Sequence, residues 1–379
     1  MRGINPIPAF LMFKLDKLAE EMPTSIKMTL GKCELPLHKE IKGAMINAIT
    51  DEEKRNKVYP SGLPELKNAL AKYYKCSENQ IVISTGTSAI FRNIYQILLN
   101  ENNGEGINVE VLLPRPYYPL YLVCAKIIPN VIVKYYDIDL KTSKIQWDTF
   151  NITDRTKIVV INSPGNPLGN IVSQEDVMKM DEIINKHRNG VSPFLGATII
   201  SDEIYSNMYF DENKKYSIID ITNIKSPFII TNSFSKGYRM YTSRVGWCIT
   251  NNLDLVKKLT IMQEHTLLTT DPVMQYGGIE ALKHQEEVEY VRKLYRKKFA
   301  YAKEKLGDRI HESEGGFYFM ISHEGKNGDE IACDILEKVG VAVVPGEDFG
   351  IPNYLRISFT TEKFEEGIDR LTEYFKKFL

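Results

Sequence analysis

Apolar runs alternate with longer mixed stretches through the middle of the 379-residue chain. The runs are nearly continuous in Val, Ile and Leu, which is typical of strands buried on both faces of a sheet. Helix-like stretches separate several of them, and this alternation predicts right-handed crossovers and a mostly parallel sheet. The predicted strands cover residues 80–84, 109–113, 131–135, 157–162, 198–202, 228–233 and 246–250.

The pattern changes towards the C-terminus. Residues 286–305 are highly charged, with apolar residues at helical spacing, and this predicts a long helix that joins two domains. Beyond it, strand and helix patterns alternate again and predict a smaller α+β domain. Strands are expected at 316–321, 341–344 and 355–359. One helix is expected at 329–339, and another from the end of the last strand to the C-terminus.

Composition and charge exclude several classes of protein. The net charge of -1 gives no reason to expect nucleic acid or an anionic membrane as a partner. No apolar run approaches the roughly 20 residues that span a bilayer, and the N-terminus has no signal-peptide layout. The five cysteines and six histidines show no metal or redox spacing. We therefore expect no metal, and we expect a cytoplasmic protein with free thiols.

The most informative segment is residues 233–236, SFSK, followed by RVGW at 244–247. A lysine that is held where it can deprotonate forms a Schiff base with an aldehyde. Two hydroxyls and an arginine beside it suit a phosphate group. Together these are the parts needed to hold pyridoxal 5′-phosphate (PLP). On this motif alone, Lys236 as an ordinary surface lysine remains the alternative.

Three further motifs accompany this segment. NSPGNPLG at 162–169 follows a predicted strand, SDEIY at 201–205 ends another, and NYLRIS at 353–358 lies near the C-terminus. The set and its order resemble the class I and II aminotransferases, which are fold type I PLP enzymes. The resemblance runs from about Gly31 to the C-terminus. It implies an α/β fold with a large PLP-binding domain at 41–297 and a small discontinuous domain made of 1–40 and 298–379.

In this family a phosphate lies at a helix start and an aromatic ring lies on the pyridine. TGTSA at 85–89 follows a strand and opens a helix, whose free N–H groups suit a phosphate. We expect Gly86 and Thr87 to be donors, and a simple helix cap is the alternative. The resemblance implies Tyr118 as the stacking ring, with Tyr117 one position away as its rival.

The resemblance also implies roles around the cofactor ring. Asn166 and Tyr205 would hydrogen-bond the ring oxygen, and Asp202 would face the pyridine nitrogen. A buried carboxylate there keeps that nitrogen protonated and the ring an electron sink. Lys236 would form the internal aldimine and, once displaced, would move a proton between Cα and the cofactor.

Further positions are implied for the phosphate and the substrate. Ser233 and Arg244 would complete the phosphate cradle, with Ser235 a weaker candidate and Arg239 a rival to the arginine. Arg356 would hold the substrate α-carboxylate through a bidentate fork, near Asn166 and Gly31. The usual continuation after this glycine is absent, which puts substrate contacts by that loop in doubt.

Tyr59 resembles the tyrosine that reaches the phosphate of the neighbouring subunit, and Thr270 is a second candidate. A shared active site would require a homodimer, and twofold dimers are also the commonest oligomers. Arg115, Arg239 and the stretch Gln263-Glu264-His265 are possible selectors of the substrate side chain, and a purely structural role is the alternative for each. Glu264 or His265 in the pocket would favour a polar or cationic side chain.

The implied activity is a PLP-dependent aminotransferase that acts on an amino acid and a 2-oxo acid. The same residues serve a C–S β-lyase, a decarboxylase or a cyclising synthase, so these stay open. A sensor domain of a transcription regulator would carry an added N-terminal DNA-binding domain, and only about 30 residues precede Gly31. A nicotinamide oxidoreductase is not supported, because no G-x-G-x-x-G follows a strand.

Overall fold

The computed structural model describes residues 10–100, 108–187, 196–323 and 327–378. Its centre is a seven-stranded sheet with the order β2-β8-β7-β6-β5-β3-β4, and only β8 runs against the others. All seven strands predicted for the middle of the chain are present, and the α/β prediction is confirmed. The strands are β2 Ile81–Ser84, β3 Val109–Arg115, β4 Val131–Asp137, β5 Thr156–Asn162, β6 Thr198–Asp202, β7 Phe228–Ser233 and β8 Gly246–Thr250.

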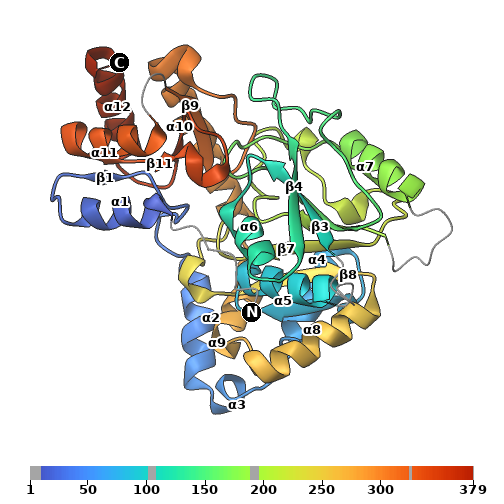
Figure 1. Cartoon of the computed structure of the whole chain (residues 1–379). Helices are drawn as coiled ribbons and strands as arrows, with labels where there is room; N and C mark the ends of the chain where they lie inside the picture. Colours follow the sequence, from blue (N-terminus) through green and yellow to red (C-terminus); the bar gives the residue numbers. More distant parts are fainter. Residues whose placement is uncertain (1–9, 101–107, 188–195, 324–326, 379) are drawn as a thin grey trace.

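Helices cover both faces of this sheet (Figure 1). On one face α5 Thr87–Asn100, α6 Pro119–Lys126 and α8 Leu253–Thr266 contribute to one buried apolar cluster. On the other face α4 Pro64–Tyr74 and α7 Gln174–His187 contribute to a second. Because both faces are covered, the central strands are apolar along their length rather than alternating.

The sheet brings distant polar residues to one edge. In the parallel register Asn162 at the end of β5 lies opposite Asp202 at the end of β6, and Asp202 lies opposite Thr231 of β7. Ser233 ends β7. Ligands of open α/β sheets bind outside the carboxyl ends of the strands, so the sheet itself places the candidate residues together.

The C-terminal part forms a smaller α+β unit. The long helix predicted at 286–305 is α10 Gln285–Leu306, and it leads to the antiparallel sheet β11-β12-β9. One expectation here is wrong in detail, because the strand predicted at 341–344 is split between two sheets. The other elements of this unit are β9 Tyr318–Ser322, α11 Gly328–Val339, β10 Val341–Ala342, β11 Val344–Pro345, β12 Tyr354–Ser358 and α12 Phe364–Phe378.

The N-terminal segment packs on this C-terminal unit. Strand β1 Ile26–Lys27 pairs in parallel with β10, and α1 Leu11–Glu20 contacts α11 and β11. Figure 1 shows the blue α1 beside the red C-terminal helices. This arrangement brings Met12 and its neighbours to the C-terminal unit across more than 300 positions of sequence.

Three more α-helices lie in the described ranges. They are α2 Lys39–Thr50, α3 Glu52–Arg55 and α9 Pro272–Ala281, and α2 packs along α9. Among the helices of the described ranges, we find none that is both long enough and apolar enough to cross a membrane.

Candidate active site

A cavity of about 370 Å³ opens at the carboxyl edge of the large sheet, and its wall includes residues from the N-terminal segment and from β9 and β12. Most residues proposed from the sequence line it. Tyr59 and Gly86 do not appear in its wall. The proposed residues that do are Gly31, Thr87, Tyr118, Asn166, Asp202, Tyr205, Ser233, Lys236, Arg244 and Arg356.

Lys236 lies just after β7, in the turn that leads back towards β8. Its Nζ donates a hydrogen bond to the carbonyl of Gly31 at 2.7 Å and lies 5.8 Å from the centre of the Tyr205 ring. Burial lowers the pKa of this lysine. A lowered pKa increases the neutral fraction of the amine, which is the form that attacks a carbonyl.

Asp202 ends β6 at the floor of the cavity. Its carboxylate accepts hydrogen bonds from the Tyr121 hydroxyl at 2.6 Å and from the Thr231 hydroxyl at 3.1 Å. Burial raises the pKa of Asp202 to about 6. A buried carboxyl group with a raised pKa favours a cationic partner, because a nearby positive charge stabilises its ionised form.

Arg356 projects from β12 and is fully enclosed. Its Nη1 donates to Asn166 Oδ1 at 3.0 Å and its Nη2 donates to the Thr29 carbonyl at 2.6 Å. Its buried Nε has no hydrogen-bond partner among the described residues. The guanidinium also lies 4.0 Å from the centre of the Tyr318 ring. A rigid, oriented guanidinium with donors left to satisfy can hold a carboxylate.

Another part of the cavity wall carries hydroxyls and a second arginine. Arg244 Nη1 lies 3.4 Å from Ser235 Oγ, and Ser233 Oγ accepts from the Ser235 backbone N–H at 3.1 Å. Thr87 begins α5. Gly86, just before it, has φ +81°, and a Cβ there would lie 2.5 Å from Arg244 Nη2. Glycine therefore leaves the space in which an anion can approach the helix start.

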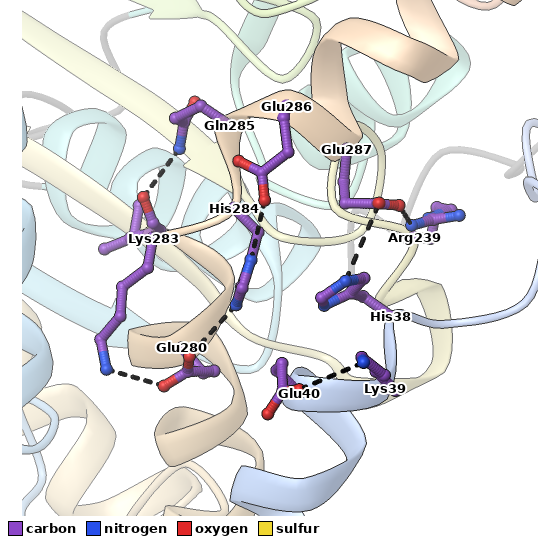
Figure 2. A network of polar contacts seen from close by, with 11 residues as sticks. His38, Lys39, Glu40, Arg239, Glu280, Lys283, His284, Gln285, Glu286 and Glu287 are labelled. Carbon is purple, nitrogen blue, oxygen red and sulfur yellow. Dashed lines mark hydrogen bonds and ion pairs between the residues drawn. The ribbon is translucent and has the colours of Figure 1, made fainter.

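The rival candidates lie elsewhere. Arg239 forms an ion pair with Glu287, and Figure 2 shows this carboxylate between Arg239 and His38. Tyr117 stacks on Tyr135, with ring centres 5.4 Å apart, and is not part of the cavity wall, whereas Tyr118 is.

The expected side-chain selectors are also outside the cavity. Arg115 makes a bidentate pair with Asp137, at 2.6 and 2.8 Å. Glu264 and His265 are exposed on α8. Within this chain none of these three side chains lines the wall.

Tyr59 is 40% exposed and lies away from the cavity of its own chain. Its backbone N–H and carbonyl both contact the Thr269 hydroxyl, at 3.3 and 3.2 Å. Thr270 is buried beside this contact and is also outside the wall.

Several wall residues were not anticipated from the sequence. Tyr318 is the most notable, since its hydroxyl lies where a Cβ on Gly31 would collide with it. Burial opposes ionisation of Tyr318, but the charges of Lys236 and Arg356 lower its pKa. In the sequence Tyr318 was indicated only by its place in the strand predicted at 316–321, just after Gly315-Gly316-Phe317. The other unanticipated wall residues include Met12, Phe13, Leu30, Tyr121 and Asn162.

The cavity thus combines an amine of lowered pKa, a buried carboxyl group, an anion site at a helix start and a carboxylate-binding arginine. This donor set fits PLP, whose aldehyde, pyridine nitrogen and phosphate need the first three groups. The fourth group suits an amino acid substrate.

Comparison with known proteins gives the same result. The family model described as Aminotransferase class I and II matches residues 24–371. An aspartate aminotransferase of Bacillus sp. (strain YM-2) is 30% identical over 344 residues, 84% of each chain. A probable aspartate/prephenate aminotransferase of Aquifex aeolicus (strain VF5) is 32% identical over 360 residues, covering 87% of this chain and 86% of that protein.

A solved structure supports the fold independently. The aspartate aminotransferase of Thermotoga maritima superposes with a TM-score of 0.84 at 24% identity, and the match covers 98% of both chains. With the family match over most of its length, this chain belongs to the class I and II aminotransferases, and it is a PLP-dependent enzyme that transfers amino groups.

Proposed function

We propose that this enzyme moves the amino group of an α-amino acid to a 2-oxo acid, with the cavity residues as its machinery. The observation that carries the proposal is the presence of Lys236, Asp202 and Arg356 in the wall of one cavity. When bound, PLP supplies an aldehyde that takes up the amino group and a ring that withdraws electrons from the substrate Cα.

Lys236 acts as the base and acid of the reaction. Burial lowers the pKa of its amine, which increases the neutral fraction. A neutral amine at this place could take a proton from the substrate Cα and deliver it to the carbon that carried the aldehyde of the cofactor. The Gly31 carbonyl holds the amine at 2.7 Å, which orients it between transfers.

The remaining roles are those that the family resemblance implies, and the place of these residues in the cavity wall supports them. Asp202 would hold the pyridine nitrogen in its protonated form, and Tyr118 would pack against the ring. Asn166 and Tyr205 would donate to the ring oxygen. The anion site binds the phosphate through Gly86, Thr87, Ser233 and Arg244.

A single-turnover absorbance scan with a panel of amino acids and no oxo acid tests the proposed reaction. We expect one amino acid to convert the cofactor once, with one equivalent of oxo acid released, and then to stall. Continued formation of product without an acceptor would contradict the proposal and indicate elimination or decarboxylation.

Arg356 binds the α-carboxylate, and Arg356→Lys is expected to raise KM for both substrates by about a hundredfold. A lysine keeps the charge but cannot bind a carboxylate bidentately while also bonding Asn166 and Thr29. Steady-state kinetics check this, with the exposed helical Arg296→Lys as the control. An unchanged KM would remove Arg356 from the substrate site.

We further propose a homodimer with shared active sites. Tyr59 is exposed and outside its own cavity, which suits a role in the partner's site. Exposed apolar side chains surround the same region of the chain and would be covered by a second copy. They include Ile46 at 60%, Ile49 at 55%, Val58 at 52% and Leu268 at 56% exposure.

Subunit mixing tests the shared site. Tyr59→Ala is expected to weaken PLP binding by about tenfold or more, since a hydrogen bond to a charged group is lost. A mixed dimer contains one Tyr59→Ala subunit and one Lys236→Ala subunit. If each active site takes Lys236 from one subunit and Tyr59 from the other, one of its two sites contains neither substitution. Activity should therefore reappear on mixing two impaired proteins. If each site is built from one chain, mixing will restore nothing.

We propose residues 41–297 as the cofactor domain and 1–40 with 298–379 as the small domain. The pairing of β1 with β10 supports this division, while residues 1–9, 324–326 and 379 lie outside the described residues. We also propose a cytoplasmic location, which the five free cysteines support.

A further inference from the structure

The first turn of α10 packs against the turn that carries Lys236. Gln285 Nε2 donates a hydrogen bond to the Tyr238 hydroxyl at 3.0 Å. Gly237 is so close to the helix that a Cβ there would lie 3.2 Å from Cγ1 of the buried Val288. The two residues that follow Lys236 in the sequence therefore both lie in contact with α10.

The third residue after Lys236 is Arg239, which forms the charged contact with α10. Its guanidinium pairs with the carboxylate of Glu287, as Figure 2 shows. Only 6% of the Arg239 side chain is exposed, and a buried charge without a partner is strongly unfavourable. Glu287 therefore fixes the place where the Arg239 side chain lies.

The backbone of Arg239 closes the turn. Its N–H donates to the Lys236 carbonyl at 3.0 Å. Its φ is +60°, a left-handed conformation that a residue with a side chain rarely adopts unless its surroundings impose it. Because the ion pair with Glu287 holds this residue by its side chain, it bears on the turn and on the position of Lys236.

Glu287 also faces the segment that leads from the N-terminal part of the chain into α2. Its carboxylate lies 3.8 Å from His38 Nε2, and the centres of the His38 and His284 rings are 4.4 Å apart. His38 immediately precedes α2, and α10 leads to the C-terminal unit. The Lys236 turn is therefore braced from the place where two connections between the large sheet and the C-terminal unit lie side by side.

We propose that Glu287 is a positioning residue of the amino-transfer reaction, and that it acts through Arg239 by holding the Lys236 turn in place. The inference rests on the proposed role of Lys236. A displacement of a reacting group by about 1 Å can lower a rate by as much as about a hundredfold. Loss of this contact should therefore lower kcat, while the carboxylate site at Arg356, on another element, should keep its affinity.

Glu287→Gln tests the proposal, because it keeps the size of the side chain and removes its charge. We expect kcat to fall by about tenfold or more and KM for both substrates to stay within about twofold. The visible circular dichroism of the bound cofactor should also change, because it reports how the cofactor and its lysine are oriented. Glu289→Gln is the matched control and should change none of the three, since Glu289 lies on the same helix and pairs with Lys293 at 2.6 Å.

Two further variants serve if Glu287→Gln folds poorly. Gln285→Ala leaves no buried charge unpaired, and loss of its hydrogen bond to Tyr238 should lower kcat by about threefold. The double variant of Arg239→Gln with Glu287→Gln removes both charges of the pair. Its kcat should be no lower than that of the slower single variant, because two residues that act as one unit do not have additive effects.

The outcomes separate this inference from the proposed function. An unchanged kcat in Glu287→Gln, a rise in KM without a fall in kcat, or losses that multiply in the double variant would overturn the inference. Borohydride reduction and peptide mapping of the wild-type holoprotein test the role of Lys236 independently. If the cofactor is on the Lys236 peptide and Glu287→Gln behaves like Glu289→Gln, only the inference fails. If the cofactor is on another peptide, the proposed role of Lys236 is wrong as well.

Discussion

Replacement of Lys236 by alanine is expected to abolish the visible absorbance of the bound cofactor and to lower turnover by more than about a thousandfold. The proton transfer that a positioned side chain provides is alone worth about 10²–10⁴ in rate, and the covalent attachment is lost with it. The fold should persist, because the lysine lies in a turn and its hydrogen bond to the Gly31 carbonyl belongs to no helix or strand.

The absorbance spectrum, single-turnover kinetics and a thermal unfolding curve check this expectation. Borohydride reduction of the wild-type holoprotein followed by peptide mapping should locate the cofactor on the peptide that contains Lys236. Lys297→Ala, on the exposed side of α10, is the control and should leave the spectrum unchanged. A spectrum retained by Lys236→Ala would show that another amine carries the cofactor.

The sequence predicted the central sheet well because its strands bury both faces. Strands of this kind are unbroken apolar runs, and β6 begins and ends where the pattern predicts. The strand predicted at 341–344 was wrong because a short apolar run does not show where a chain changes partner. Val341 and Ala342 pair with β1, whereas Val344 and Pro345 pair with β12.

Candidate site residues were predictable where a motif holds several of them in order. The choice of Tyr118 over Tyr117 rested on the family resemblance alone, because the two differ by one position and both belong to an aromatic segment. In the structure Tyr118 immediately precedes α6 and lines the cavity, while Tyr117 turns towards Tyr135. The backbone turn at the helix start separates them, and side-chain composition does not report it.

Contacts between residues that are far apart in the sequence could not be predicted from local sequence patterns. Met12 meets Arg356 from 344 positions away, and nothing at either site specifies the other. The possible selectors Glu264 and His265 had suggested a polar or cationic substrate, but both are exposed on α8. Met12 and Phe13, which do line the wall, come from a segment whose sequence carries no motif.

Replacement of Asp202 by asparagine is expected to lower turnover while it raises the stability of the cofactor-free protein. Turnover should fall by at least about a hundredfold, as when one oriented electrostatic partner of a reacting group is removed. The amide keeps the size of the carboxyl group and can still bond Tyr121 and Thr231. It cannot, however, hold a proton on the pyridine nitrogen.

Above pH 6 the same substitution should raise the free energy of unfolding of the cofactor-free protein. Burial raises the pKa of Asp202 from 3.8 to about 6, so between these values the folded chain binds more protons than the unfolded chain. The contribution of Asp202 to stability therefore falls as pH rises through this window. Asparagine does not titrate. The free energy of unfolding of the variant should therefore exceed that of the wild type by near zero at pH 4 and by as much as about 3 kcal/mol at pH 7.

Denaturant unfolding of both apoproteins across this pH range measures the gain, and Glu203→Gln provides the matched control. Glu203 is the next residue, is also buried, and has its pKa raised to about 7 by burial, but it is not in the cavity wall. Its replacement should stabilise the apoprotein at neutral pH and leave turnover unchanged. If Asp202→Asn behaved in the same way, its carboxylate would be a structural acid and not the partner of the cofactor. A loss of turnover confined to Asp202→Asn would instead show that the buried charge is retained for catalysis at a cost in stability.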